Sequence, residues 1–469
     1  MADRPAWLDG ALAYAESWLA IQLRVHEQPG VAVAVAHEGE IVFERAFGCA
    51  DLATGEPLTP RHRMRVASQS KSFTAAGILC LLDEGKLRLD DRCGTHVSGL
   101  HPSVAVATIG QLLSHSGGIV RDGPDSSQFV DRIPYRGRAE LLADLAEPSP
   151  VETGLRLKYS NHGYGLLGLV IEAVTGQPYP DWIAERVIRP AGLTETVPDA
   201  AFAGSARLAS GHSGKRPLGR RVVIPGHNPT HAIAPAGGFV STAADLARFF
   251  GQLDPAAPTS ILSAASRREM TRRHWRDDGA SLERHYGLGL EVSAPGSWAT
   301  FGHSGGLQGF ISRTLVVPEP RLAISVLTNA IDGPAHGWVD GLVHILRRFK
   351  EADPTAEGLA AWRGRWWSIW GAVDLVPVGQ RVLAAYPALF LPFADAAEIE
   401  VTGPDEGRIV KSQGFGSPGE AVRVIRGEDG APRELQLGGA FLSLESDLVR
   451  EMEERYAPPP LGVVGAITM

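Results

Sequence analysis

Ser68 and Lys71 are spaced so that they can act together as a nucleophile and its base. They lie at the start of a predicted apolar helix that ends near Gly85, and three residues of helix place both side chains on one face. A serine hydroxyl attacks a carbonyl only when a neighbouring group removes its proton. A lysine amine can remove that proton where burial and nearby dipoles lower its pKa.

The S-x-x-K pattern is weak by itself, because about 0.4 matches are expected by chance at this composition. Of the 45 lysines and arginines only six are lysines, and Ser68 is the only serine with a lysine at this spacing. Arginine keeps its proton near neutral pH whereas lysine can lose it, so a lysine at position 71 favours a base. The alternative is that Ser68 caps the helix and Lys71 is solvated.

Tyr159 and Asn161 form a second element, Y-x-N, directly before another predicted helix. The chain has eight tyrosines and three asparagines, so this pattern is expected only about 0.05 times by chance. The tyrosine can relay a proton when a cation such as Lys71 lowers its pKa. The asparagine can hold Lys71 and present its amide to a substrate carbonyl. The alternative is a helix cap beside a packed tyrosine.

His303, Gly305 and Gly306 form the third element. The pattern H-x-G occurs five times, but only this copy begins a glycine-rich piece between two predicted late strands. Backbone N–H groups there can face a cleft, and glycine lets a substrate approach the backbone closely. Such an edge strand would supply one oxyanion donor, with the Ser68 N–H as the other. The alternative is an ordinary hairpin.

In this order the three motifs resemble those of the penicillin-recognising serine hydrolases. The branch that they resemble contains class C β-lactamases, D-aminopeptidases, D,D-carboxypeptidases and family VIII esterases. Two further stretches, 112–118 and 237–242, are similar to its LLxHxSG and GGxxST segments, and the resemblance spans roughly residues 10–348. It implies the α+β fold of the β-lactamases and transpeptidases: an antiparallel sheet flanked by helices, beside a helical subdomain.

The resemblance also implies a role for each motif residue. Ser68 would attack a carbonyl, and Lys71 would accept or relay its proton. Tyr159 would protonate the leaving group and later activate water, while Asn161 would orient Lys71 and the substrate. The N–H groups of Ser68 and Gly306 would hold the oxyanion. No metal and no organic cofactor is implied.

His303 departs from the β-lactamase pattern, which has a lysine at this position. A histidine is mostly neutral at pH 7 and does not offer the same fixed charge to a substrate carboxylate. The H-x-G form resembles D-aminopeptidases and some carboxypeptidases, whereas esterases of the branch often carry tryptophan. We therefore expect Asn161, His303, Gly305 and Gly306 to bind substrate.

The expected function is acyl-enzyme hydrolysis of a small amide, peptide or ester, with peptide-like substrates that can contain D-amino acids favoured. One alternative is a family VIII-type carboxylesterase with little amidase activity. The other is a non-hydrolytic sensor on the penicillin-binding fold.

Composition narrows the class of protein further. The chain has 469 residues, 44% of them hydrophobic, which suffices for a large core and more than one domain. A net charge of -8 without a long basic run argues against nucleic-acid binding, and no apolar stretch reaches the roughly 18 residues of a membrane span. Three cysteines without metal spacing indicate free thiols in the cytoplasm. The expected partner is a small-molecule substrate, and a homo-oligomer is allowed.

Strands come early and late in the first 350 residues, with helices between them, which is an α+β pattern. Helices are predicted at 8–25, after Ser68 and at 161–174, and a helix cap at 241–245. Strands are predicted at 30–36, 40–47, 298–301, 310–317 and 322–327. Tight turns between the late strands predict antiparallel pairing.

The character of the sequence changes near residue 350. We predict a serine β-lactamase-like hydrolase domain at 1–350 and an antiparallel β domain at 351–469, barrel-like and similar to the lipocalin-like domains of some peptidase relatives. Its predicted strands are 398–401, 408–411, 421–425, 434–437 and 441–444. A cluster of four tryptophans, Trp362, Trp366, Trp367 and Trp370, predicts a core or a domain interface, with a carbohydrate platform as the alternative.

Two turn-rich segments, 120–138 and 207–231, are candidates for shaping substrate choice. The second carries Lys215, Arg216, Arg220 and Arg221. Both are predicted to be solvated loops rather than specific anion sites.

Overall fold

The computed structural model describes residues 4–202, 207–225, 228–281, 283–293 and 298–456. Internal contacts divide the chain into two compact units, His26–Val339 and Met1–Val25 with Asp340–Met469. The first unit combines helices with an antiparallel sheet, and the second contains a closed antiparallel barrel. The predicted α+β class with a terminal barrel-like domain is therefore confirmed.

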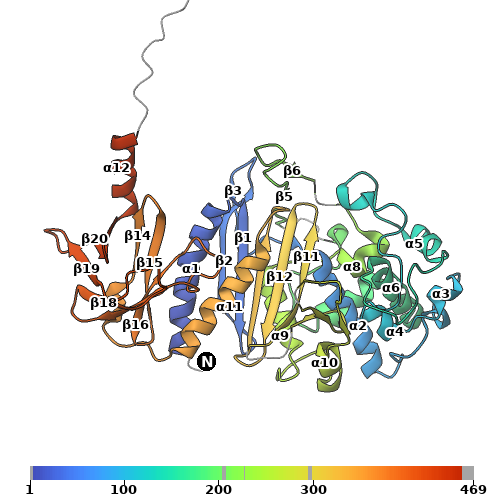
Figure 1. Ribbon diagram of the computed structural model, residues 1–469. Coiled ribbons are helices and arrows are strands. Elements are labelled where there is room, and N and C mark those ends of the chain that lie inside the picture. Colours follow the sequence, from blue (N-terminus) through green and yellow to red (C-terminus); the bar gives the residue numbers. More distant parts are fainter. Residues whose placement is uncertain (1–3, 203–206, 226–227, 282, 294–297, 457–469) are drawn as a thin grey trace, which may run out of the picture. The chain divides into compact units, whose positions relative to one another are not determined.

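A nine-stranded antiparallel sheet forms the frame of the first unit, in the order β3-β2-β1-β13-β12-β11-β10-β9-β8 (Figure 1). Its strands are β1 Gly30–His37, β2 Glu40–Asp51, β3 Glu56–Pro57, β8 Trp275–Arg276, β9 His285–Tyr286, β10 Glu291–Val292, β11 Phe301–Leu307, β12 Phe310–Val317 and β13 Leu322–Thr328. β1 and β13 are mainly apolar and lie side by side near the middle of the sheet. Their side chains are buried on both faces, as such runs predict.

Helix α2, Ser70–Asp83, is the central helix of the first unit. It is buried from Ser70 to Leu81 and packs against α6, Asn161–Thr175, and α8, Ala234–Gly237. A helix that is apolar around its whole circumference must be enclosed by protein. The other helices of this unit are α3 Pro102–Ala105, α4 Ile109–Leu113, α5 Arg138–Leu145, α7 Tyr179–Ile183, α9 Ala243–Gln252 and α10 Ala264–Thr271.

Two helix ends predicted from the sequence have the expected local chemistry. The Thr242 hydroxyl accepts a hydrogen bond from the Asp245 N–H (3.3 Å) and caps α9. Gly176 adopts a left-handed conformation (φ 70°) and ends α6. α9 packs on β1, β12 and β13, so its cap fixes a helix that covers the sheet.

The glycine-rich third motif lies inside a strand, which corrects the sequence prediction. A strand was expected at 298–301, with His303 in the connection after it. Instead β11 runs from Phe301 to Leu307 and pairs residue by residue with β12. Glycine has a low strand propensity, so the local sequence indicates a turn. The ladder to β12 stabilises the extended conformation despite that propensity.

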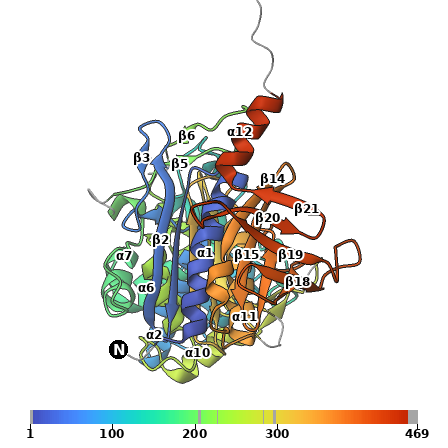
Figure 2. The same cartoon turned by 90° about the vertical axis from the view of Figure 1, so that its left-hand side faces the viewer.

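The second unit contains a closed barrel of eight antiparallel strands (Figure 2). The strands are β14 Gly364–Ser368, β15 Gly371–Val378, β16 Arg381–Ala385, β17 Ala397–Val401, β18 Glu406–Lys411, β19 Ala421–Arg426, β20 Pro432–Leu437 and β21 Ala440–Ser443. The sequence predicted five of these strands and missed the first three. Buried side chains including Trp362, Trp366 and Ile399 fill the interior, as expected for eight strands.

Three helices complete this unit: α1 Ala6–Val25, the end of α11 Ala335–Glu351, and α12 Glu445–Tyr456. The contacts therefore group α1 with the barrel, whereas the sequence ranges placed both α1 and α11 in the hydrolase domain. Contacts do not test which parts of the chain fold by themselves. The predicted division into domains at 1–350 and 351–469 therefore stays a prediction.

The tryptophan cluster divides by environment. Trp362 and Trp366 lie in the barrel core, with 3% and 4% of their surface exposed. Trp370, in the turn between β14 and β15, is 92% exposed. The core interpretation is therefore correct for the first two side chains only.

Trp366→Ala is expected to lower the free energy of unfolding of the barrel unit by about 3–5 kcal/mol, because it leaves a cavity in the core. Trp370→Ala, the matched control, should change it by less than about 0.5 kcal/mol. Urea unfolding followed by circular dichroism measures both. Equal losses in the two variants would contradict this assignment of the core.

Candidate active site

Ser68 lies in a short turn between a strand and helix α2. β4, Met64–Arg65, pairs with β7, Val240–Ser241, and a 3-10 turn at Ala67–Gln69 then leads into α2. Ala67 has φ 52°, a left-handed conformation that is costly for alanine and is held here by buried packing. Ser68 is not the helix cap of the alternative interpretation, because it is Gln69 that precedes α2.

The Lys71 amine is completely buried next to the Ser68 hydroxyl. Lys71 Nζ lies 3.2 Å from Ser68 Oγ and donates to Asn161 Oδ1 (2.7 Å) and to the Ala236 carbonyl (2.7 Å). A neutral amine has two N–H donors and one lone pair. Because both acceptors are carbonyl oxygens, the two N–H groups are committed to them and the lone pair is left for the Ser68 proton.

The pKa of Lys71 is well below its ordinary value. Burial is the main cause, since it removes the solvent that stabilises the ammonium form. The charge of Asp122 opposes this shift and that of Arg121 adds to it. This direction is the one that a proton acceptor requires, and the role of Lys71 as a base stays a prediction.

Tyr159 donates its hydroxyl to Ser68 Oγ at 2.8 Å. Its pKa is raised by burial, and the hydrogen bond to Ser68 only partly offsets this. The sequence-based expectation that Lys71 would lower the pKa of Tyr159 is therefore wrong. Because burial disfavours the phenolate, the phenol of Tyr159 keeps its proton at neutral pH and can donate it.

Asn161 connects Lys71 to a carboxylate that the sequence analysis missed. Its Oδ1 accepts from Lys71, and its Nδ2 donates to Asp122 Oδ1 at 2.6 Å. Ser160 caps α6 by accepting from the Gly163 N–H (2.8 Å), which fixes Asn161 as the first residue of the helix. The side-chain amide is thus oriented from both ends. No local pattern identifies Asp122, which lies 39 positions before Asn161.

His303 is buried and held at both ring nitrogens. Nδ1 donates to the Ser304 carbonyl (2.6 Å), so Nε2 accepts from the Tyr286 hydroxyl (2.9 Å) in the neutral ring. Burial lowers the pKa of His303, although Glu291 opposes the shift. The predicted neutral histidine is consistent with this environment.

Gly305 and Gly306 bring β11 directly against the nucleophile turn. A Cβ at Gly305 would lie 2.1 Å from the Val66 carbonyl oxygen, which only glycine avoids. The Ser304 N–H donates to Glu291 Oε1 (3.2 Å) and therefore points away from β12. Alternate N–H groups in a strand point the same way, so the Gly306 N–H faces this open edge as well.

A cleft of about 480 Å³ opens over these groups. Six predicted residues, Ser68, Tyr159, Asn161, His303, Gly305 and Gly306, line it, and Lys71 lies beneath them. Arg121, Asp122 and Phe129 also line it, so the predicted 120–138 segment contributes to the cleft.

The second segment predicted to shape substrate choice contributes no lining residue to this cleft from its described part. Lys215 and Arg221 form ion pairs with Glu27 and Asp332 instead. Residues 226–227 of that segment lie outside the described chain.

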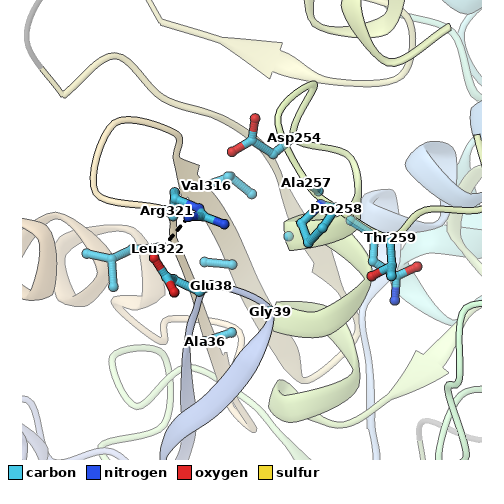
Figure 3. A pocket seen from close by; sticks show the side chains of 13 residues that line it. Ala36, Glu38, Gly39, Asp254, Ala257, Pro258, Thr259, Val316, Arg321 and Leu322 are labelled. Atoms are coloured by element: carbon cyan, nitrogen blue, oxygen red, sulfur yellow. Dashed lines mark hydrogen bonds and ion pairs between the residues drawn. The ribbon is translucent and has the colours of Figure 1, made fainter. Parts of the chain in front are cut away.

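A smaller pocket of about 50 Å³ lies near the β1–β2 turn (Figure 3). Its lining includes Asp254 and the ion pair of Glu38 with Arg321 (3.0 Å). Its lining has no serine or cysteine, so it offers no comparable nucleophile.

The described residues contain no group of three or more His, Cys, Asp or Glu side chains placed to hold a metal ion. Within the same part of the chain, no helix combines the length and the apolar character that a bilayer span requires.

Comparison with known proteins identifies the class to which this fold and site belong. The family model described as Beta-lactamase matches residues 19–338, and the chain belongs to this family. It is accordingly a serine hydrolase, as the motifs predicted. The resemblance to penicillin-recognising hydrolases with an appended β domain is confirmed.

Two curated relatives and one solved structure illustrate the relationship. The chain is 31% identical to "Penicillin-binding protein 4" of Amycolatopsis lactamdurans, over 65% of this chain and 81% of the relative. It is 26% identical to a "D-aminopeptidase" of Brucella anthropi, over 73% of this chain and 64% of the relative. An octameric penicillin-binding protein homologue from Pyrococcus abyssi shares the fold, with TM-score 0.65 and 22% identity over 92% of this chain and 99% of its own.

Lys71→Met is expected to lower turnover by about 100- to 10,000-fold, because methionine has a similar length but no amine to accept the Ser68 proton.

The variant also tests the protonation state of Lys71 through the pH dependence of stability. The unfolded chain binds a proton on Lys71 up to a pH of about 10.4, whereas the folded amine loses it at lower pH. Between these two pKa values the unfolded state binds more protons, so wild-type stability must rise with pH relative to Lys71→Met.

Urea unfolding of both proteins across this pH range provides the measurement. A stability difference that stays constant or falls with rising pH would show that Lys71 is charged in the folded protein.

Tyr159→Phe removes the hydroxyl that contacts Ser68 Oγ and keeps the ring, whose centroid lies 4.2 Å from that of His115. We expect kcat to fall about 100- to 10,000-fold with the fold intact. Tyr164→Phe is a matched control, because its hydroxyl donates to the Leu113 carbonyl and not to Ser68. Steady-state assays with p-nitrophenyl acetate and melting curves distinguish the two variants. Near-normal kcat in Tyr159→Phe would remove Tyr159 from the mechanism.

Proposed function

We propose that this serine hydrolase acts through an acyl-enzyme on Ser68, with small amides or peptides as its main substrates. The observation that carries the proposal is the placement of Ser68 Oγ between a buried amine (3.2 Å) and a phenol (2.8 Å) at the base of a cleft. A serine so placed has a proton acceptor and a proton donor in contact with the same oxygen.

In the proposed acylation step, Lys71 takes the Ser68 proton as the oxygen attacks the substrate carbonyl. The N–H groups of Ser68 and Gly306 stabilise the negative oxygen of the tetrahedral intermediate. Tyr159 then protonates the leaving amine, and Lys71 returns its proton to the phenolate. Water enters in the second half and is deprotonated by the same pair, which releases the acid and restores Ser68.

Amide-type substrates are favoured by two features. His303 is buried and neutral, so it offers no fixed positive charge to the carboxylate of a β-lactam. The relative from Brucella anthropi is named D-aminopeptidase, and this supports amino-acid amides that can include the D series. A family VIII-type carboxylesterase is the second candidate, because the same three side chains can also cleave an ester.

The cytoplasmic location and the homo-oligomer expected from the sequence are proposals as well. Cys80 and Cys93 are buried free thiols, which supports a reducing compartment. Sedimentation analysis of the purified chain measures the subunit number.

A fluorophosphonate probe is expected to label the wild-type protein once, on Ser68, and to leave Ser68→Ala unlabelled. Peptide mass spectrometry identifies the site. The label separates a hydrolase from a non-hydrolytic sensor, since a protein that forms no adduct with this probe or with penicillin does not carry out the proposed chemistry. Hydrolysis rates on D-amino-acid amides and p-nitrophenyl esters then decide between amidase and esterase, and negligible amide turnover favours the esterase.

A further inference from the structure

Glu291 places a fixed carboxylate in the cleft beside the nucleophile. It lies in β10 opposite Gly302 of β11, and its side chain is 39% exposed into the region lined by Ser68 and His303. Its Oε1 accepts from both the N–H and the hydroxyl of Ser304 (3.2 and 2.5 Å). One carboxylate oxygen is therefore oriented by the protein, and the other accepts no hydrogen bond from the described residues.

The carboxylate of Glu291 is ionised. Burial alone would raise its pKa, but His303, Arg313 and the Ser304 hydrogen bonds together hold the pKa below its ordinary value. The Ser304 hydrogen bonds stabilise the charged form without neutralising it.

The other charges that line the cleft among the described residues are already compensated. Arg121 Nε pairs with Asp122 Oδ2 at 3.0 Å, and Asp122 Oδ1 accepts from Asn161. Burial lowers the pKa values of Lys71 and His303, which reduces the positive charge that they contribute at neutral pH. Arg313, opposite Ser304 in β12, does not line the cleft, so among the described lining residues the charge left over is that of Glu291, and a negative charge in a partly desolvated cleft favours a cationic ligand.

The position of Glu291 relative to the oxyanion donor fixes where a ligand's charge would lie. Ser304 and Gly306 are two residues apart in β11, so their N–H groups are separated by roughly 6–7 Å along the same edge. Glu291 accepts from the Ser304 N–H, and the substrate carbonyl oxygen is expected at the Gly306 N–H. An α-ammonium group lies about 3 Å from its own carbonyl oxygen and reaches a carboxylate about 3 Å further on.

We propose that Glu291 binds the ammonium group of an amino-acid amide or peptide and selects acyl donors with a positive charge next to the scissile carbonyl. This inference rests on the proposed function and specifies the substrate class of the same site. Asp122 is excluded from this role because both of its oxygens are engaged.

The experiment compares D- and L-alanine p-nitroanilide with propionyl p-nitroanilide, which is the same acyl group without the amine. At pH 7 the α-amino group is mainly protonated. The wild type is expected to prefer one alanine compound by at least about tenfold in kcat/KM. In Glu291→Gln this preference should fall about 10- to 100-fold, chiefly through KM, because a charged hydrogen bond is replaced by a neutral one.

Glutamine keeps an oxygen for the Ser304 donors, so the local structure is retained. Glu283→Gln is the matched control: it removes the same charge nearby, from a side chain that pairs with His285 and does not line the cleft. It should leave the preference unchanged. If Glu291→Gln melts well below the wild type, Glu291→Asp is used instead. It keeps the charge and shortens the side chain by one methylene, so it should give an intermediate preference.

If anilide turnover is too slow, the same preference is read from inhibition of p-nitrophenyl propionate hydrolysis by D- and L-alaninamide and by propionamide. Equal inhibition or equal kcat/KM for charged and uncharged compounds in the wild type overturns the assignment, and so does an unchanged preference in Glu291→Gln. In either case, hydrolysis of the uncharged compounds shows that the proposed function stands. Failure of every substrate together with no Ser68 label would instead remove the proposed function itself.

Discussion

The site depends on the burial of the Lys71 amine, which no carboxylate among the described residues contacts directly. A carboxylate bonded directly to Nζ would raise the pKa of the amine and hold its proton. Here Nζ meets two carbonyl oxygens, and Asp122 reaches it only through the Asn161 amide. Desolvation therefore prevails, and the pKa of the amine beside Ser68 stays well below its ordinary value.

The same low-dielectric environment keeps the neighbouring groups uncharged. Burial raises the pKa of Tyr159 and lowers the pKa values of His115 and His303. Neutral hydrogen-bonding groups thus surround the reacting oxygen, while Arg121 and Glu291 carry their charges at the more exposed wall of the cleft. In the proposed mechanism, this separation lets protons move between Lys71, Tyr159 and Ser68 and leaves substrate charge to be recognised at the exposed wall.

Close packing of a strand on a turn sets the remaining geometry. Gly305 allows β11 to approach the Val66 carbonyl more closely than any Cβ would permit. The Ser312 hydroxyl donates to that same carbonyl (3.0 Å) from the neighbouring strand β12. Because Val66 and Ala67 lead directly to Ser68, these contacts fix the distance between the nucleophile and the open edge of β11.

Features encoded within a few residues were accessible from the sequence alone: the pair Ser68 and Lys71 on one helical turn, the Y-x-N element at a helix start, the buried strand β1 and several strands of the barrel. The tertiary structure decided that the pKa of Lys71 falls and that the pKa of Tyr159 rises. It also decided that Asp122 and Glu291 line the cleft. It also placed the third motif inside β11. The reason is physical: the acceptors of the Lys71 amine lie 90 and 165 positions away in the chain, and a pKa depends on such distant neighbours and on the solvent that they exclude.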